Sequence, residues 1–404
     1  MTDMNVIVGA GQAGGWAAIA MRQAGFTGRL LLIGEEPWRP YERPPLSKAM
    51  LTGDAEPPVL FFHDQARYAE LNIDLLLGTA VDELDSAAHR IGLRDGRRLP
   101  YDRLLLATGG RARRLSIPGS ETIHLLRTLE DARSIRARLA SARHVICIGA
   151  GVIGLEIASS AHTRGCQVTV LEAAPIAMGR CVSPEGAHFV EALHRAAGVD
   201  LRFGVTIQAI EPGSHGAVQV ICNDETLAAD CVIAGVGMER NLALAQMAGL
   251  AIEGGILADE LGRTSAPDVY AAGDIAAFLH PHYGRRLRLE SWRHAQDHGI
   301  AVGRSMAGDP TPYDAIPWFW TDQHGVNLQI TGLPAEAART VVRIDRPPAF
   351  VAVHLAADDS VVGVTAAGSP RDIRAGSALT KTRRPIDPVL LADPQVPLQR
   401  FLTR

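Results

Sequence analysis

The chain has 404 residues, enough for two or three domains that each bury a core of their own. Hydrophobic residues make up 47%, charged residues 21%, and the net charge is −4, a balance that gives no indication of nucleic-acid binding. No run of about 18 or more apolar residues occurs, so no membrane span is expected. A buried strand begins close to Met1, which leaves no signal peptide to expect, and the five scattered cysteines fit a cytoplasmic protein without a disulfide framework.

The first predicted unit is a strand, a glycine-rich turn, a helix and a second strand that is followed by an acidic residue. Its elements, in order, are a strand over residues 5–8, the turn Gly9-Ala10-Gly11-Gln12-Ala13-Gly14, a helix over residues 12–24, a strand over residues 30–33, and Glu35. The glycines allow a tight turn that holds a pyrophosphate at the helix N-terminus, and the acid binds ribose hydroxyls. A solvated strand end is the alternative for Glu35.

A proline-rich segment follows, and we expect residues 37–45 to be extended because prolines resist a helix. Lys48 comes directly after it. Only Lys48 and Lys381 among 40 basic residues are lysines, so Lys48 can mark a place for a compact ammonium where a guanidinium does not fit, although chance is the alternative. Further on, an apolar strand over residues 104–107 ends in the small turn residues Thr108 and Gly109.

A second copy of the nucleotide-binding unit begins 140 residues after the first. Its elements are a strand over residues 144–148, the turn Gly149-Ala150-Gly151-Val152-Ile153-Gly154, a strand over residues 168–171, and Glu172. One such glycine motif is weak evidence, but the complete pattern repeated in order is strong. Two dinucleotide sites indicate a flavin cofactor and a nicotinamide substrate. Glu172 favours NADH over NADPH because it would repel a 2′-phosphate, and Arg180 is the one residue that complicates this preference.

The pattern of the first unit resumes at residues 269–274, so the second unit is predicted to be inserted into the first. From about residue 321, short strands separated by turn residues, and then a helical tail, predict a small α+β domain. The predicted domains are an FAD-binding domain in two parts (residues 1–112 and 240–320), an inserted NAD-binding domain (residues 113–239) and a C-terminal cap (residues 321–404).

The sequence lacks the residues that disulfide chemistry and metal binding require. No cysteine precedes Cys147, so the chain lacks the cysteines that disulfide reductases and peroxidases of similar layout place near the flavin. No metal-binding spacing and no four-cysteine iron–sulfur set occurs, so we expect no metal site in this chain. A metal centre that takes part in its reaction would belong to a partner protein.

The segments Arg43-Pro44-Pro45-Leu46-Ser47-Lys48 and Pro317-Trp318-Phe319-Trp320 carry a more specific resemblance. With them the whole chain resembles the FAD-dependent NADH:ferredoxin reductases that serve Rieske-type aromatic-ring dioxygenases, and their putidaredoxin-reductase-like relatives that serve cytochrome monooxygenases. The resemblance implies an α/β fold with two Rossmann-like dinucleotide-binding domains, as in glutathione reductase, plus the C-terminal α+β domain.

The resemblance also implies roles for individual residues. Lys48 is expected beside flavin N5 with Glu156 as its partner, and Trp320 at the flavin edge toward an iron–sulfur protein; these three are the catalytic candidates. An ordinary helix glutamate is the alternative for Glu156. The FAD candidates are Gly9, Gly11, Ala13, Gly14, Glu35, Arg43, Lys48, Val81, Ala107, Thr108, Gly109, Arg127, Gly273, Asp274 and Trp292. The NADH candidates are Gly149, Gly151, Ile153, Gly154, Glu156, Glu172 and Gly237.

The implied function is transfer of electrons from NADH through FAD, one at a time, to a small [2Fe–2S] ferredoxin, with a Rieske type favoured. That ferredoxin would feed a terminal oxygenase, in particular an aromatic-ring-hydroxylating dioxygenase. Arg285, Arg286 and Arg288 form a solvated face or, alternatively, a docking patch for an acidic ferredoxin. Other functions remain open: an NADH-dependent reductase of rubredoxin, a quinone or a small radical, or a redox sensor similar to apoptosis-factor flavoproteins.

Overall fold

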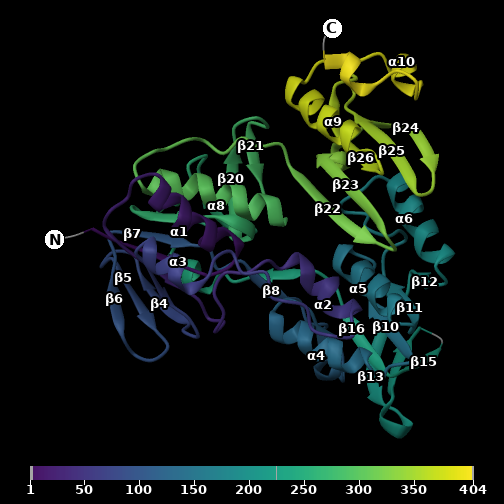
Figure 1. Cartoon of the computed structure of the whole chain (residues 1–404), viewed down its shortest axis with the longest axis horizontal. Coiled ribbons are helices and arrows are strands. Elements are labelled where there is room, and N and C mark those ends of the chain that lie inside the picture. The colour runs from purple at the N-terminus through teal and green to yellow at the C-terminus, as the bar shows by residue number, and fades with distance from the viewer. Residues whose placement is uncertain (1–2, 224, 403–404) are drawn as a thin grey trace. The chain divides into compact units, whose positions relative to one another are not determined.

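The computed structural model describes residues 3–223 and 225–402. The chain forms two compact units, and each is assembled from three segments of the sequence (Figure 1). The first unit comprises Met1–Glu42, Pro58–Arg111 and Glu239–Ala315. The second comprises Arg43–Pro57, Ala112–Met238 and Ile316–Arg404.

The first unit contains a parallel sheet with the strand order β19-β7-β1-β2-β3. Its strands are β1 (Met4–Val8), β2 (Arg29–Ile33), β3 (Ile73–Leu76), β7 (Arg103–Leu106) and β19 (Val269–Ala271). The central strands are runs of Val, Ile and Leu that are buried on both faces, as a parallel sheet requires. The strand order reverses at β1, because β2 lies on one side of it and β7 on the other. In such sheets ligands bind at this point, beyond the carboxyl ends of the strands.

Helices α1 (Gln12–Gln23) and α8 (Trp292–Met306) pack against each other in the first unit (Figure 1). Glycines allow this close approach: a Cβ atom on Gly299 would lie 2.3 Å from the carbonyl oxygen of Ala13, and one on Gly303 would lie 2.5 Å from that of Ala17. The remaining elements of the unit are α3 (Gln65–Glu70), β4 (Val81–Asp85), β5 (Arg90–Leu93), β6 (Arg98–Pro100), α7 (Ala243–Met247), β18 (Ile256–Ala258), β20 (Ala276–His280) and β21 (Arg285–Leu287).

The second unit contains another parallel sheet, with the strand order β12-β11-β10-β16-β9. All of its strands lie between β7 and β19 in the sequence. They are β9 (His124–Leu125), β10 (His144–Ile148), β11 (Gln167–Glu172), β12 (Asp200–Phe203) and β16 (Cys231–Ala234). The accompanying elements are α2 (Ala49–Thr52), α4 (Leu129–Leu139), α5 (Val152–Thr163), α6 (Pro184–Ala196), β13 (Ile207–Pro212), β14 (Val218–Cys222) and β15 (Thr226–Ala229). Short strands β8 (Gly110–Ala112) and β17 (Met238–Arg240) lie where the sequence passes between the units.

The C-terminal part of the second unit is an antiparallel sheet with the order β22-β23-β26-β25-β24 (Figure 1). Its elements are β22 (Trp318–Gln323), β23 (Val326–Gly332), β24 (Arg339–Arg346), β25 (Ala349–Leu355), β26 (Val361–Ala367), α9 (Pro370–Thr382) and α10 (Pro388–Ala392). Phe350 of this sheet stacks on Phe189 of α6, with ring centroids 4.9 Å apart, so the sheet shares a core with the nucleotide-type sheet of the same unit.

The predicted fold class is confirmed: two doubly wound α/β parts and an α+β C-terminal part are present. One local expectation was wrong, because Pro44 and Pro45 begin a 3₁₀ turn (Pro44–Ser47) instead of ending an extended segment. Proline fits the first position of such a turn because its missing N–H needs no partner there. β22 also crosses the predicted boundary between residues 320 and 321, and the domain boundaries as a whole remain a prediction. Within residues 3–223 and 225–402, no helix is both long and apolar enough to cross a membrane.

Buried histidines make the stability of the fold depend on pH. Burial lowers the pKa of His194 and of His354 to about 4 and that of His294 to about 3. An unfolded histidine titrates near 6.5, so from about pH 6.5 down to about pH 4 the unfolded chain binds protons that the folded chain does not. The free energy of unfolding should therefore decrease as the pH is lowered through this window, by up to about 3 kcal/mol for each histidine.

Denaturant unfolding at about pH 7 and about pH 5 tests this dependence. In His354→Gln, the free energy of unfolding should decrease less between the two pH values than in the wild type. In His188→Gln, a change at an exposed histidine, the decrease should equal that of the wild type. An equal pH slope in wild type and His354→Gln would contradict the assignment.

Candidate functional site

The first glycine turn has a backbone shape that only glycine allows. Gly9 has a φ of 112°, and a Cβ atom on it would lie 2.3 Å from the carbonyl oxygen of Ala107. A Cβ atom on Gly14 would lie 1.9 Å from the carbonyl oxygen of Gly9. Gly11 is the N-cap of α1 and supplies no capping side chain, so the first backbone N–H groups of the helix are left for a ligand. The turn is therefore a backbone cradle for a phosphate.

Two further turns lie at the carboxyl ends of neighbouring strands in the first unit. After β7, the carbonyl oxygen of Thr108 accepts a hydrogen bond of 2.9 Å from the side chain of Asn241, and Gly109 has a φ of 55°. After β19, Gly273 has a φ of 77°, and a Cβ atom on it would lie 2.8 Å from the Cβ of Ala13. The three predicted cofactor segments of this unit thus converge on the edge of the sheet where β1, β7 and β19 end.

Three other predicted FAD residues lie in the first unit. Glu35, two residues beyond β2, is exposed and forms a 3.2 Å ion pair with Arg94. Val81 begins β4 and is half-buried. Trp292 begins α8, and its indole N–H donates a hydrogen bond to Glu42. Burial raises the pKa of Glu42 despite this hydrogen bond.

The second glycine turn repeats the geometry of the first. Gly149 has a φ of 97°, and a Cβ atom on Gly154 would lie 2.0 Å from the carbonyl oxygen of Gly149. Gly151 is the N-cap of α5, again without a capping side chain. The carboxylate of Glu172, at the end of β11, accepts backbone hydrogen bonds of 2.6 Å from Ala150 and 2.7 Å from Ala174. Glu172 is thus held against the turn.

Four further predicted cofactor residues of the second unit lie at three places. Ile153, in the first turn of α5, is 41% exposed, which is unusual for isoleucine and leaves its side chain available to a ligand. Gly237 has a φ of 105°, and a Cβ atom there would lie 3.6 Å from a guanidinium nitrogen of Arg180. Arg43 donates a 2.5 Å hydrogen bond to the carbonyl oxygen of Arg127, so the structure brings these two predicted FAD residues together.

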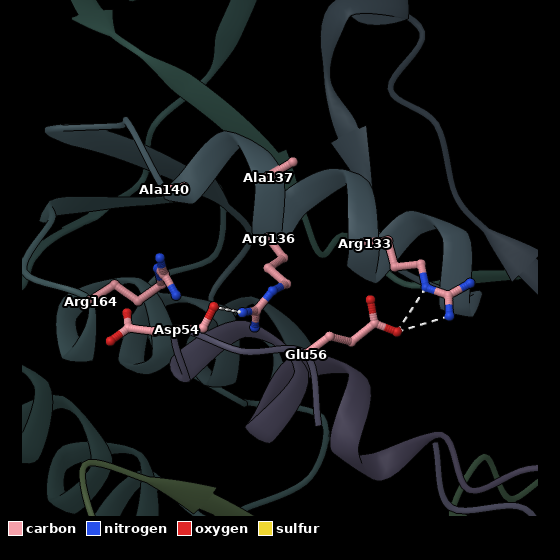
Figure 2. Close-up of a pocket in the computed structure, with 7 residues that line it drawn as sticks. All are labelled: Asp54, Glu56, Arg133, Arg136, Ala137, Ala140 and Arg164. Carbon is pink, nitrogen blue, oxygen red and sulfur yellow. Dashed lines mark hydrogen bonds and ion pairs between the residues drawn. The ribbon is translucent and has the colours of Figure 1, made fainter. Parts of the chain in front are cut away.

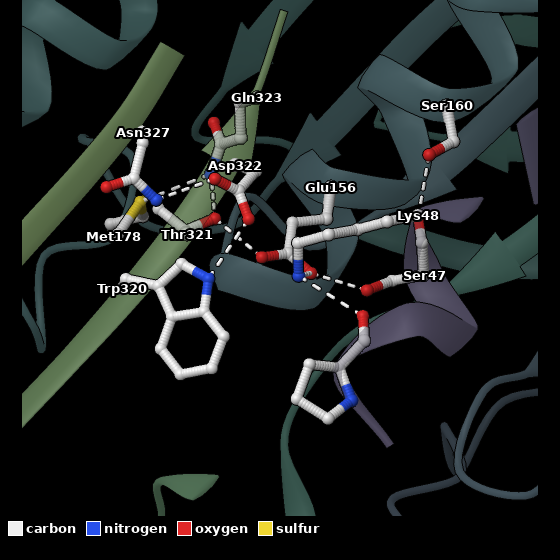
Figure 3. Close-up of polar contacts among 11 residues, drawn as sticks. Ser47, Lys48, Glu156, Ser160, Met178, Trp320, Thr321, Asp322, Gln323 and Asn327 are labelled. Atoms are coloured by element: carbon white, nitrogen blue, oxygen red, sulfur yellow. Dashed lines mark hydrogen bonds and ion pairs between the residues drawn. The ribbon is translucent and has the colours of Figure 1, made fainter. Parts of the chain in front are cut away.

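Lys48 and Glu156 form a largely buried ion pair (Figure 3). Lys48 Nζ lies 2.8 Å from Glu156 Oε2, and the two side chains are 22% and 2% exposed. The hydroxyl of Ser47 donates to the same Oε2 atom, and the hydroxyl of Thr321 donates to Oε1 at 2.7 Å. Lys48 Nζ also donates to the carbonyl oxygen of Pro44 at 3.3 Å. Glu156 is therefore no ordinary surface residue of a helix.

Arginine side chains donate hydrogen bonds to the backbone that follows Lys48 (Figure 2). Arg136 of α4 donates to the carbonyl oxygens of Met50 and Asp54, and Arg164, which caps α5, donates to that of Gly53 at 2.7 Å. A hollow on the second unit is lined by Arg136, Arg164, Asp54, Glu56, Arg133, Ala137 and Ala140. The guanidinium groups satisfy carbonyls at the end of α2, so the short helix beside Lys48 is fixed in place.

Trp320 lies on β22, where it stacks on Trp318 with ring centroids 5.3 Å apart. Its indole N–H donates to Asp322 at 3.0 Å, and Asn327 donates to the same carboxylate at 2.6 Å (Figure 3). The tryptophan is half-buried, so part of the residue remains accessible.

All five cysteines are free thiols. Burial raises the pKa of Cys147 and of Cys231, so both thiols are unreactive. Among the residues that the structure describes, no cluster of three or more His, Cys, Asp or Glu side chains could hold a metal ion.

Comparison with known proteins gives the class of this chain. Residues 4–299 match the family described as pyridine nucleotide-disulphide oxidoreductase, and residues 318–402 match the reductase C-terminal domain. The chain belongs to the pyridine nucleotide-disulphide oxidoreductase family and is an oxidoreductase.

Within that family the chain is similar to ferredoxin reductases. It is 39% identical over 396 residues to the ferredoxin–NAD(+) reductase component of the p-cumate 2,3-dioxygenase system of Pseudomonas putida, covering 98% of this chain and 97% of that one. The ferredoxin reductase for the CYP199A2 system of Rhodopseudomonas palustris has a similar structure, with a TM-score of 0.94, 35% identity and coverage of 99% and 100%. The reductase in the covalent putidaredoxin reductase–putidaredoxin complex also gives a TM-score of 0.94, with 37% identity and coverage of 99% and 98%.

Sequence reasoning missed several residues of the site. Ser47 and Gln323 were not considered, although Ser47 lies inside one segment that carries the resemblance and Gln323 follows shortly after the other. His194 and Arg136 lie in helices without any recognisable motif. Only the folded chain brings His194 to Gln323 and Arg136 to the backbone after Lys48.

A pair of alanine variants separates packing from ligand binding at the second turn. Gly154→Ala should unfold the turn or strongly destabilise the protein, because its Cβ would collide with backbone at 2.0 Å. Gly151→Ala should fold normally, since its φ is −76° and its Cβ would lie 3.7 Å from the nearest backbone atom. We expect Gly151→Ala to weaken NADH binding about tenfold or more, because the added methyl group occupies the approach of the pyrophosphate.

Thermal unfolding and NADH titration measure the two effects. Normal NADH affinity in a folded Gly151→Ala protein would contradict a nucleotide site at this turn.

Proposed function

We propose that this chain is an NADH-dependent FAD flavoprotein that passes electrons one at a time to a small [2Fe–2S] ferredoxin, which feeds an oxygenase. The observation that carries the proposal is the joint presence of two glycine cradles and the Lys48–Glu156 pair, with no cysteine in the segment around Lys48. The relatives' names point the same way: a ferredoxin–NAD(+) reductase component of a dioxygenase system, and a reductase in complex with putidaredoxin.

The first unit fits FAD. Gly9 and Gly14 form a tight turn in which any side chain would collide with backbone, and α1 presents its N-terminal N–H groups there. We assign the phosphates of FAD to this turn and a ribose to Glu35, which would have to exchange its exposed ion pair with Arg94 for ribose hydroxyls. Asp274 and Trp292 are assigned to the flavin end. Residues 1–112 and 240–320 are assigned to the FAD-binding domain.

The second unit fits NADH. The turn at Gly149 and Gly154 offers the phosphate cradle, and Glu172, held beside it, is assigned to a ribose. A carboxylate at this position disfavours the 2′-phosphate of NADPH. The side chain of Arg180 near Gly237 is the one cation that can soften the preference. Residues 113–239 are assigned to the NAD-binding domain and residues 321–404 to the cap.

When bound, FAD would supply the redox chemistry, namely hydride acceptance from NADH and one-electron release. The chain contributes a fixed positive charge at Lys48, which complements negative charge that develops on the cofactor. Glu156 holds the ammonium in one place, and the arginine-bound α2 holds its backbone. Trp320 is assigned to the electron exit toward the ferredoxin. A cytoplasmic location is part of the proposal.

Reduction of the purified protein tests the proposal. The protein should be yellow with about one FAD per chain, and anaerobic NADH should bleach the flavin band faster than NADPH at equal concentration. Turnover with a [2Fe–2S] ferredoxin should exceed turnover with rubredoxin or a quinone. A colourless protein, or a flavin that NADH does not bleach, would overturn the proposal; faster turnover with rubredoxin or a quinone would reassign the electron acceptor.

A further inference from the structure

A chain of hydrogen bonds leads from Glu156 deep into the second unit. Thr321 Oγ1 lies 2.7 Å from Glu156 Oε1, and Gln323 Nε2 lies 2.9 Å from Thr321 Oγ1 (Figure 3). Gln323 Oε1 lies 2.8 Å from His194 Nε2. His194 Nδ1 lies 3.1 Å from His324 Nε2.

Burial makes each of these contacts costly to lose. Thr321 is 1% exposed, Gln323 2% and His194 0%. A buried polar group without a partner costs about 1–3 kcal/mol, so each member has to be satisfied by its neighbours. Water is not needed to complete the chain.

The chemistry of the members fixes the direction of every bond. An ionised carboxylate only accepts, so the Thr321 hydroxyl must donate to Glu156. Its oxygen then accepts from the amide nitrogen of Gln323. Because the amide oxygen of Gln323 only accepts, His194 must carry its proton on Nε2.

The same logic extends to the end of the chain. With its proton on Nε2, His194 accepts at Nδ1, so His324 donates from Nε2. Burial lowers the pKa of His194 to about 4, which agrees with a neutral ring carrying one proton. Gln323 Nε2 also lies 3.8 Å from Met178 Sδ, a weak acceptor that suits the amide nitrogen on that side.

The far end of the chain is held by the β22–β23 hairpin. His324 and Gly325 form its two-residue turn, with φ values of 48° and 76°. The backbone N–H of His324 donates to Ser159 Oγ on α5 at 2.8 Å, and its ring lies against that of His162. α5 therefore carries Glu156 near one end of the chain and its anchor at the other.

We propose that Thr321, Gln323 and His194 are positioning residues for the Lys48–Glu156 pair. Because every hydrogen bond in the chain has a fixed direction, the Thr321 hydroxyl donates to Oε1 of Glu156. Oε2 therefore stays turned toward Ser47 and Lys48. The inference rests on the proposed function, which assigns to Lys48 the positive charge that assists hydride transfer to the flavin. A Thr321 hydroxyl turned away from Glu156 would leave Oε1 unsatisfied and let the carboxylate rotate.

The tautomer of His194 tests the chain without any reference to activity. Nitrogen-15 NMR of the histidine rings in the holoprotein, with His194→Gln to assign the signal, should show the proton on Nε2 at about pH 7. A proton on Nδ1, or a doubly protonated ring, would overturn the proposed direction.

Thr321 variants test the positioning role. In rapid mixing with NADH, Thr321→Val should lower the limiting rate of flavin bleaching about tenfold, the effect of one hydrogen bond to a charged group, with the Kd for NADH within about twofold. Thr321→Ser should restore most of the rate, because it restores the hydroxyl. A wild-type rate in Thr321→Val, a changed Kd at unchanged rate, or no rescue by serine would each overturn the role.

Gln323→Glu gives a sharper version of the same test. A carboxylate at this position accepts from both neighbours, so it should draw the Thr321 hydroxyl away from Glu156 and slow bleaching at least as much as Thr321→Val. The same substitution at the exposed Gln399 controls for the added charge and should leave the rate unchanged. If the wild type is itself not bleached by NADH, the proposed function fails, and the tautomer of His194 still decides the direction of the chain.

Discussion

One buried carboxylate, that of Glu156, joins three segments of the second unit. It accepts hydrogen bonds from Ser47, from Lys48 and from Thr321, and it lies itself on α5. Removing one partner from a buried ion pair costs about 3–5 kcal/mol, because the remaining charge is left without compensation. The carboxylate thus has a structural role and a functional one at once: the groups that keep it in place also set the position of the only lysine in the first half of the chain.

The rest of the second unit supports that position from two sides. Arg136 and Arg164 bind the carbonyls that follow Lys48, so its backbone cannot drift away from α4 and α5. On the other side, the C-terminal sheet contributes Thr321 and Gln323 through β22. The C-terminal sheet, which the sequence predicted as a cap, therefore completes the polar surroundings of the lysine. The glycine turns act differently, since they offer only backbone and gain their specificity from the absence of side chains.

The repeated parts of the fold could be predicted from sequence, whereas most of the polar network could not. The two glycine turns with Glu35 and Glu172 follow from local spacing, because strand, turn and helix are contiguous in the chain. The C-terminal strands were also recognisable by their β-branched residues, although β22 begins earlier than expected. Contacts such as those of Thr321 with Glu156 and His194 with Gln323 join residues 165 and 129 positions apart, and no local pattern encodes them. The pairing of Lys48 with Glu156 was expected only from resemblance, and the roles assigned to the site residues remain predictions.

The most direct test of the account is a double-mutant cycle on the Lys48–Glu156 pair. The limiting rate of flavin bleaching by NADH would be measured in Lys48→Met, in Glu156→Gln and in the double variant, each checked for bound FAD. If the two side chains act as one unit, each single variant should slow bleaching about tenfold or more, and the double variant should be about as slow as the slower single one. A double variant whose bleaching rate falls by the product of the two single effects would contradict the claim that the pair acts as one unit. Single variants that bleach at the wild-type rate would contradict it as well.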